Sequence, residues 1–184
     1  MKTSNTTHQK GFTLVEIAIV LVIIGLLLGG VLKGQELIAN AKVKSAQQEV
    51  QAFSAAIYSY VDKTGYLPGD NPNETNNAGD GDGTIDNGER QPLFQHLKDQ
   101  GLISGDYDGS TYAKHAWGGD IIIDEDTQIS GLTAMYNNLP RDVAEQLDLK
   151  MDDGDSATGD VQINGGAANY SDTDTQNDVL IKVY

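Results

Sequence analysis

The chain has no cysteine among its 184 residues and only three histidines. Without thiols it forms no disulfide bonds, so disulfides contribute nothing to its stability. A transition-metal site is not expected either, because zinc is usually held by clustered cysteines and histidines. His115 has no second histidine nearby in the sequence, and His96 is expected to be a surface or packing residue.

Basic residues are also scarce. Lysine and arginine total 12, against 27 aspartates and glutamates, which gives a net charge of −15. The imbalance lies in the second part of the chain: from residue 66 onward, 23 acidic and six basic residues give −17. A domain this acidic repels nucleic-acid phosphates, so direct nucleic-acid binding is not expected. Its composition suits a solvated surface or the binding of a hard cation such as calcium.

The motifs of common enzyme classes are missing as well. The sequence contains no G-x-S-x-G, no P-loop and no H-E-x-x-H. A membrane-anchored hydrolase that uses acidic residues alone would need a defined pair of carboxylates, and no spacing singles one out. We therefore expect that the protein is not an enzyme.

No proline occurs before Pro68, and this proline-free region begins with a long apolar stretch. Residues 12–32 (FTLVEIAIVLVIIGLLLGGVL) contain a single charged residue, Glu16. About 20 apolar residues are enough for one helix to span a bilayer. On hydropathy alone the stretch is either an uncleaved single-span anchor or a cleaved signal peptide.

The residues around the start of this stretch favour a third interpretation. The segment Lys10-Gly11-Phe12-Thr13-Leu14-Val15-Glu16 resembles the prepilin cleavage and methylation motif of type IV pilins and type II secretion pseudopilins. The resemblance implies that a prepilin peptidase cuts between Gly11 and Phe12, and that the new amine of Phe12 is methylated. It also implies partners: copies of the same or related subunits in a helical filament, an assembly platform protein and an ATPase.

Glu16 has two interpretations. A carboxylate in the first turn of a helix is favoured by the helix dipole, so capping of the helix is one explanation. The resemblance implies the other, in which Glu16 pairs with the N-terminal amine of a neighbouring subunit. A charge inside lipid is costly when it is unpaired, so this pairing would promote docking of subunits and set their register.

Helical patterning continues beyond the apolar stretch. Apolar residues recur at spacings of three and four and form one stripe: Val43, Ala46, Val50, Phe53, Ile57 and Tyr60. Thr64-Gly65, with Pro68 beyond it, predicts the end of a single helix over residues 12–63. We expect an α+β, pilin-like fold in which this long helix packs on a small antiparallel sheet with acidic Gly/Asn/Asp-rich loops.

Four parts of the chain follow from these patterns. Residues 1–11 are the leader that is removed, and residues 12–34 are the membrane-spanning or filament-core half of the helix. Residues 35–65 are its amphipathic half, and residues 66–184 form the acidic head domain.

A Gly/Asn/Asp-rich loop over residues 71–89 contains a candidate calcium site. The run Asp80-Gly81-Asp82-Gly83-Thr84-Ile85, followed by Glu89, resembles positions 3 to 12 of an EF-hand loop. The first ligand position holds Ala78, for which Asn76, Asn77 or Asp70 is a candidate substitute. The alternative is a flexible, solvated loop. The predicted ligands are Asp80, Asp82, the carbonyl of Thr84, Asp86 and Glu89.

Weaker patterns predict the rest of the head domain. We expect helices over 90–103 and 140–150, a turn over 124–126 and irregular structure over 164–177. Strands are expected over 111–117, 121–123, 128–136, 160–163 and 179–184. A second acidic cluster is either another cation site or the solvated carboxylates of a helix end and hairpin turn: Asp148, Asp152, Asp153 and Asp155.

The resemblance to pilins and pseudopilins implies a structural subunit that waits in the bacterial inner membrane with its head outside the cytoplasm. It would then assemble into a periplasmic pseudopilus or an extracellular pilus. Calcium would stabilise the head domain in place of a disulfide. The alternative is a single-span, calcium-binding membrane protein that keeps its leader and does not polymerise.

Overall fold

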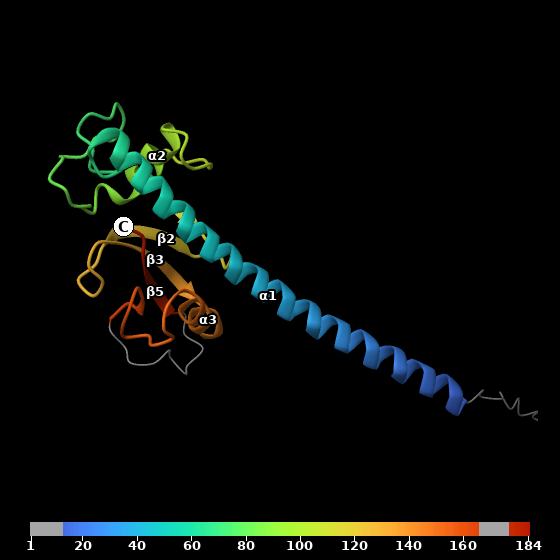
Figure 1. Cartoon of the computed structure of the whole chain (residues 1–184). Coiled ribbons are helices and arrows are strands. Elements are labelled where there is room, and N and C mark those ends of the chain that lie inside the picture. Colours follow the sequence, from blue (N-terminus) through green and yellow to red (C-terminus); the bar gives the residue numbers. More distant parts are fainter. Residues whose placement is uncertain (1–12, 166–176) are drawn as a thin grey trace, which may run out of the picture. The chain divides into compact units, whose positions relative to one another are not determined.

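The computed structural model describes residues 13–165 and 177–184. The chain forms two compact units, Met1–Asn40 and Ala41–Tyr184, which are described separately within those residues. Helix α1 (Leu14–Thr64) begins in the first unit and ends in the second (Figure 1). Its 51 residues confirm the prediction of one long helix, although the predicted first residue, Phe12, lies outside the described residues.

In the first unit, α1 exposes apolar side chains on every side. Leu14 is 90% exposed and Leu26 is 73% exposed, and the apolar residues between them are similarly uncovered. By length and composition, this is a helix able to cross a membrane. A helix that is apolar all round is stable only when lipid or other helices cover it.

In the second unit, the remaining turns of α1 bury one face against a sheet. Every residue of the predicted stripe is at most 5% exposed, which confirms that prediction: Val43, Ala46, Val50, Phe53, Ile57 and Tyr60. The helix ends at Thr64, and Gly65 follows with a φ of 79°. This left-handed conformation is easy for glycine and ends the helix where the sequence predicts.

The sheet has five antiparallel strands in the order β1-β2-β3-β5-β4 (Figure 1). In the centre, Ile123 of β2 lies opposite Ala134 of β3, which lies opposite Ile181 of β5. All three side chains are buried, so this face of the sheet forms the core together with α1. This small antiparallel sheet confirms the predicted α+β class. The strands are β1 (Ala113–Lys114), β2 (Asp120–Glu125), β3 (Leu132–Leu139), β4 (Val161–Ile163) and β5 (Asn177–Lys182).

Two short helices complete the second unit. Helix α2 (Arg90–Asp99) packs on α1 through an edge-to-face contact of Phe94 with Phe53, whose ring centroids are 5.7 Å apart. Helix α3 (Arg141–Met151) buries Leu147 and contacts β4 and β5. Pro140 was expected as the first helical residue, but it precedes α3 as its N-cap because its ψ of 146° is extended.

Several predicted boundaries in the sheet were wrong. Residues 124–126 were predicted as a turn, yet Asp124 and Glu125 complete β2, and an ion pair from Arg90 partners Asp124. The strand predicted over 128–136 begins only at Leu132, because the amide of Gln128 donates to Asp126 in a turn and Gly131 has a φ of 100°.

The strand predicted over 111–117 is reduced to the two residues of β1, since a tight turn follows it. In that turn the amide of Gly118 donates to the carbonyl of His115 over 2.9 Å. The helix predicted within residues 90–103, with Gly101 as its stop, is α2. It ends at Asp99, and Gly101 follows with a φ of 70°, which confirms the predicted stop. The irregular segment expected over 164–177 falls largely on residues 166–176, which lie outside the described residues.

Candidate functional site

The first turn of α1 holds Glu16 in a reciprocal cap. The amide and hydroxyl of Thr13 donate to Oε2 of Glu16 over 2.8 and 2.7 Å, and the amide of Glu16 donates to the Thr13 hydroxyl over 3.3 Å. This is the capping-box arrangement, which satisfies free amides at a helix start. Both bonds to the carboxylate use Oε2, so within the described residues Oε1 stays open to a further partner. Gly11 and Phe12, the predicted processing residues, lie outside the described residues.

The acidic loop before α2 is organised around Asp70, which is 1% exposed. Its Oδ1 accepts the amides of Gly81 and Asp82 over 2.6 and 3.2 Å, and its Oδ2 accepts the amide of Gly83 over 2.9 Å. Three consecutive backbone donors therefore converge on one buried carboxylate. Because they belong to the predicted cation-binding run, Asp70 holds that run in its curved shape.

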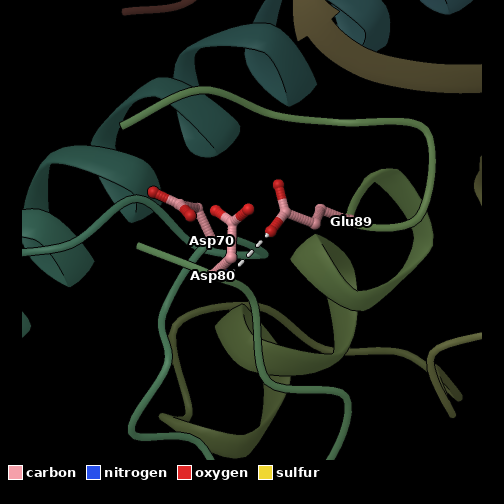
Figure 2. A group of neighbouring side chains, drawn as sticks. All are labelled: Asp70, Asp80 and Glu89. Atoms are coloured by element: carbon pink, nitrogen blue, oxygen red, sulfur yellow. Dashed lines mark hydrogen bonds between the residues drawn. The ribbon is translucent and has the colours of Figure 1, made fainter. Parts of the chain in front are cut away.

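Asp70 also meets two of the predicted ligands. One oxygen from each of Asp70, Asp80 and Glu89 lies within 4.8 Å of the others. Figure 2 shows the three side chains next to one another, with Asp80 between Asp70 and Glu89, Asp70 and Asp80 on neighbouring loop segments, and Glu89 beside α2. Asp70, a candidate substitute for Ala78, therefore has its carboxylate within this group. Asn77, another candidate substitute, instead donates its side-chain amide to Gln95.

The remaining predicted ligands lie beside this group. Oxygens of Asp80, Asp82 and Asp86 form a second set within 4.8 Å of one another, so Asp80 belongs to both sets. Asp80 accepts the amide of Asp82 over 3.1 Å, and Asp82 accepts the amide of Thr84 over 2.8 Å. These local bonds leave the other oxygens of both carboxylates available to a cation.

None of the ion pairs among the described residues involves an acidic residue of this loop. Arg90, which directly follows Glu89, pairs with Asp124. Burial raises the pKa of Glu89, and the charges of Asp70 and Asp80 raise it further, although two amides that donate to Glu89 oppose the shift. A carboxyl group whose pKa is raised by burial and by neighbouring negative charges, as that of Glu89 is, marks a place where a cation would stabilise the fold.

Close backbone approaches keep Asp70 in position. A Cβ added to Gly79 would lie 2.3 Å from Cα of Asp70, so only glycine fits there. On the other side, the amide of Gly69 donates to Nδ1 of His96 over 2.9 Å, while Nε2 of His96 lies 3.1 Å from the carbonyl of Asn77. His96 is 1% exposed and is therefore a packing residue that anchors the loop to α2.

Replacing Asp70 by asparagine tests this role in the absence of any cation. Asparagine offers one acceptor oxygen, so at least one of the three converging amides would face an NH₂ group. An unpaired buried donor costs about 1–3 kcal/mol, and we expect the free energy of unfolding to fall by that amount. The measurement is denaturant unfolding of the full chain in detergent with chelator present, followed by the fluorescence of Trp117.

Asp108→Asn is the matched control for this substitution. A single oxygen of Asp108, Oδ1, accepts both bonds from Ser110 at an exposed turn, so asparagine retains them. We expect a change within about 0.5 kcal/mol, as for an ordinary surface substitution. Equal losses in the two variants would contradict an organising role for Asp70.

The second predicted cluster is brought together only in part. Oxygens of Asp148, Asp152 and Asp153 lie within 4.8 Å of one another, whereas Asp155 is not in this group and accepts the amide of Ala157 over 3.1 Å. The grouped carboxylates also bond to the local turn: Asp152 accepts the amide of Val161 over 3.1 Å and Asp153 the hydroxyl of Thr158 over 3.0 Å. This geometry suits the end of a helix and a hairpin turn.

Comparison with known proteins identifies the N-terminal part of the chain. Residues 6–32 match the family described as the prokaryotic N-terminal methylation motif. This is the prepilin-type motif of type IV pilins and pseudopilins, so the resemblance seen in residues 10–16 is confirmed. No curated protein and no solved structure matches the chain. The motif therefore supports a precursor of the type IV pilin-like or pseudopilin class, and the long N-terminal helix with its small antiparallel sheet is consistent with a pilin-like α+β fold.

Proposed function

We propose that the protein is a structural subunit of a type IV pilus-like filament or a type II secretion pseudopilus. The observation that carries the proposal is the methylation motif at residues 6–32, which includes the exposed apolar turns at the start of α1. In the membrane these turns would face lipid. In a filament the same turns would pack against those of neighbouring copies and form an apolar core, with the acidic heads on the outside.

The proposed life of the protein has two stages. The precursor sits in the bacterial inner membrane with its head outside the cytoplasm, and prepilin peptidase cuts between Gly11 and Phe12. An assembly platform protein and its ATPase then transfer mature subunits into a periplasmic pseudopilus or an extracellular pilus. Glu16 acts in this second stage, where its Oε1 forms an ion pair with the methylated N-terminal amine of a neighbouring subunit.

Intact-mass analysis of the protein purified from its membrane tests the proposal. We expect the loss of the 11-residue leader MKTSNTTHQKG and the gain of one methyl group on Phe12. Electron microscopy of material sheared from cells should then show filaments that contain the processed chain. A precursor that keeps its leader in cells with an active prepilin peptidase would contradict the proposal and favour a non-polymerising membrane protein.

We also propose that the acidic loop binds one calcium ion. Asp70, Asp80, Asp82, Asp86 and Glu89 would supply carboxylate oxygens, and Thr84 would supply its carbonyl. The grouping of these carboxylates, and the charge repulsion among them, support the proposal. Such a cation would stabilise the head domain as a disulfide would, because it would link the segment after α1 to the start of α2. Calcium binding alone would also fit the non-polymerising alternative, so it is tested separately from filament formation.

A further inference from the structure

A pocket of about 320 Å³ lies beside α1 in the second unit and belongs to neither acidic cluster. One wall comes from α1 and the other from the segment that follows α2. Most of the lining residues are apolar or aromatic, polar and apolar atoms share the pocket surface about equally, and the pocket is partly open to solvent. Its principal lining residues are Glu49, Ala52, Phe53, Leu102, Ile103 and Tyr107.

Glu49 is the only charged side chain among the described residues that line this pocket. Its Oε2 accepts the hydroxyl of Tyr136 over 3.2 Å, which leaves Oε1 free of any described hydrogen bond. No ion pair within the described residues involves Glu49. Lys98 on α2 donates instead to the carbonyl of Tyr107 over 3.0 Å.

The electrostatics of the pocket favour a cation. Burial raises the pKa of Glu49, and the hydrogen bond from Tyr136 only partly opposes this shift. Burial also raises the pKa of Tyr107, and the negative charge of Glu49 raises it further, so the two side chains interact electrostatically. A half-buried carboxylate with one neutral donor is costly unless a positive charge joins it.

We propose that this pocket binds an alkylammonium group. The ammonium lies at Glu49, the aliphatic arm lies against Phe53, Leu102 and Ile103, and the ring of Tyr107 adds an aromatic face to the cation's surroundings. Two sources carry this chemistry: a lysine side chain of a second copy, and a free alkylamine. Only the first source rests on the proposed assembly of copies. Lys44 and Lys150 are exposed and make no ion pair among the described residues.

The ligand chemistry is tested with n-butylammonium and the full chain in detergent, by protein-detected NMR at the amides of Ile103 and Ser104. We expect saturable binding to the native chain, and binding at least tenfold weaker for n-butanol, which has the same arm without the charge. Glu49→Gln should weaken n-butylammonium binding at least tenfold. Tyr136→Phe, which removes the phenol but keeps the carboxylate, should retain it.

Ala52→Phe gives a second variant that leaves Glu49 in place. Ala52 is an exposed helical residue at the edge of the pocket, so a larger side chain there should obstruct the arm and weaken binding without disturbing the core. Equal binding by the native chain and Glu49→Gln, or by n-butanol and n-butylammonium, would overturn the proposal. So would unchanged binding in a folded Ala52→Phe variant.

A zero-length carbodiimide crosslink then distinguishes the two sources. Applied to membranes or sheared filaments and read by mass spectrometry, a bond between Glu49 and a lysine of another copy identifies the second copy as the donor. If n-butylammonium binds and no such bond forms, the source is a free amine. The binding experiment does not need filaments, so a lack of n-butylammonium binding and a lack of filaments are separate results that test the two proposals independently.

Discussion

Replacing Glu16 by glutamine should abolish filaments while leaving the processed protein in the membrane. Glutamine keeps the reciprocal cap with Thr13, because one amide oxygen can accept both Thr13 donors that now bond to Oε2. It removes the negative charge, and with it the proposed ion pair to the methylated amine of the next subunit. The comparison therefore separates the two explanations of Glu16, capping and pairing.

The expected size of this effect follows from the surroundings. An ionised side chain at the centre of a bilayer costs about 2.5–3.5 kcal/mol on insertion scales. Glu16 lies in the first turn of the span and would bear part of that cost, which a partner charge from the next subunit would offset. Glu16→Gln removes the charge, so docking next to another subunit no longer gains free energy from pairing with its amine. We expect normal amounts of processed protein in membrane fractions and no filaments in sheared material.

Glu36→Gln is the matched control for Glu16→Gln. Glu36 is also an exposed carboxylate of α1, but it already pairs with Lys33 one turn away, at 2.7 Å. An exposed pair of this kind contributes little to stability, so filaments should form normally. Normal filaments from Glu16→Gln as well would show that the cap is the whole function of Glu16.

Calcium should raise the melting temperature of the native chain by several degrees, and Asp80→Asn should remove most of that rise. Extracellular calcium modules bind with dissociation constants of about 10⁻⁴–10⁻³ M. At 10 mM calcium this affinity corresponds to about 1.4–2.7 kcal/mol of stabilisation. For a chain of this size the melting temperature should then rise by about 3–10 °C, measured by the fluorescence of Trp117.

Asp80 is the sharpest position for this test because its carboxylate belongs to both acid groups. Asparagine retains the bond from the amide of Asp82 to Oδ1, so the turn itself survives. Without calcium, Asp80→Asn should be at least as stable as the native chain, since it relieves repulsion with Asp70 and Glu89. Asp108→Asn, which removes an exposed charge elsewhere, should keep the full calcium response. An equal response in Asp80→Asn would remove the calcium proposal and leave the filament proposal untouched.

Local patterns predicted the long helix well. The apolar stripe from Val43 to Tyr60 and the stop at Gly65 depend only on residue type and spacing along one helix. The strands were located less accurately, because their ends depend on pairing with distant residues. Asp124 and Glu125 have the composition of a turn, yet pairing with Thr133 and Leu132 and the ion pair from Arg90 keep them in β2.

The candidate cation site shows the same division between local and distant information. The spacing of Asp80, Asp82 and Glu89 predicted one continuous ligand loop, whereas the structure groups Asp80 with Glu89 in one set and with Asp82 in another. The contribution of Asp70 comes from ten residues earlier and depends on the close approach of Gly79, which spacing alone does not encode. Glu49 lies off the apolar stripe of α1, and its pocket exists only because the segment after α2 lies over α1, which the local pattern does not encode.

The lengths of the two outer strands have a consequence for how copies of this protein meet. In the described part of the chain, β1 has two residues and β4 has three, which makes them the shortest strands of the sheet. An edge this short presents few free backbone groups, so it is a poor template for a strand from another molecule. Heads crowded side by side are thereby protected from fusing into one continuous sheet. In the proposed filament, lateral growth by strand pairing would therefore be disfavoured, and subunits would polymerise through the helix.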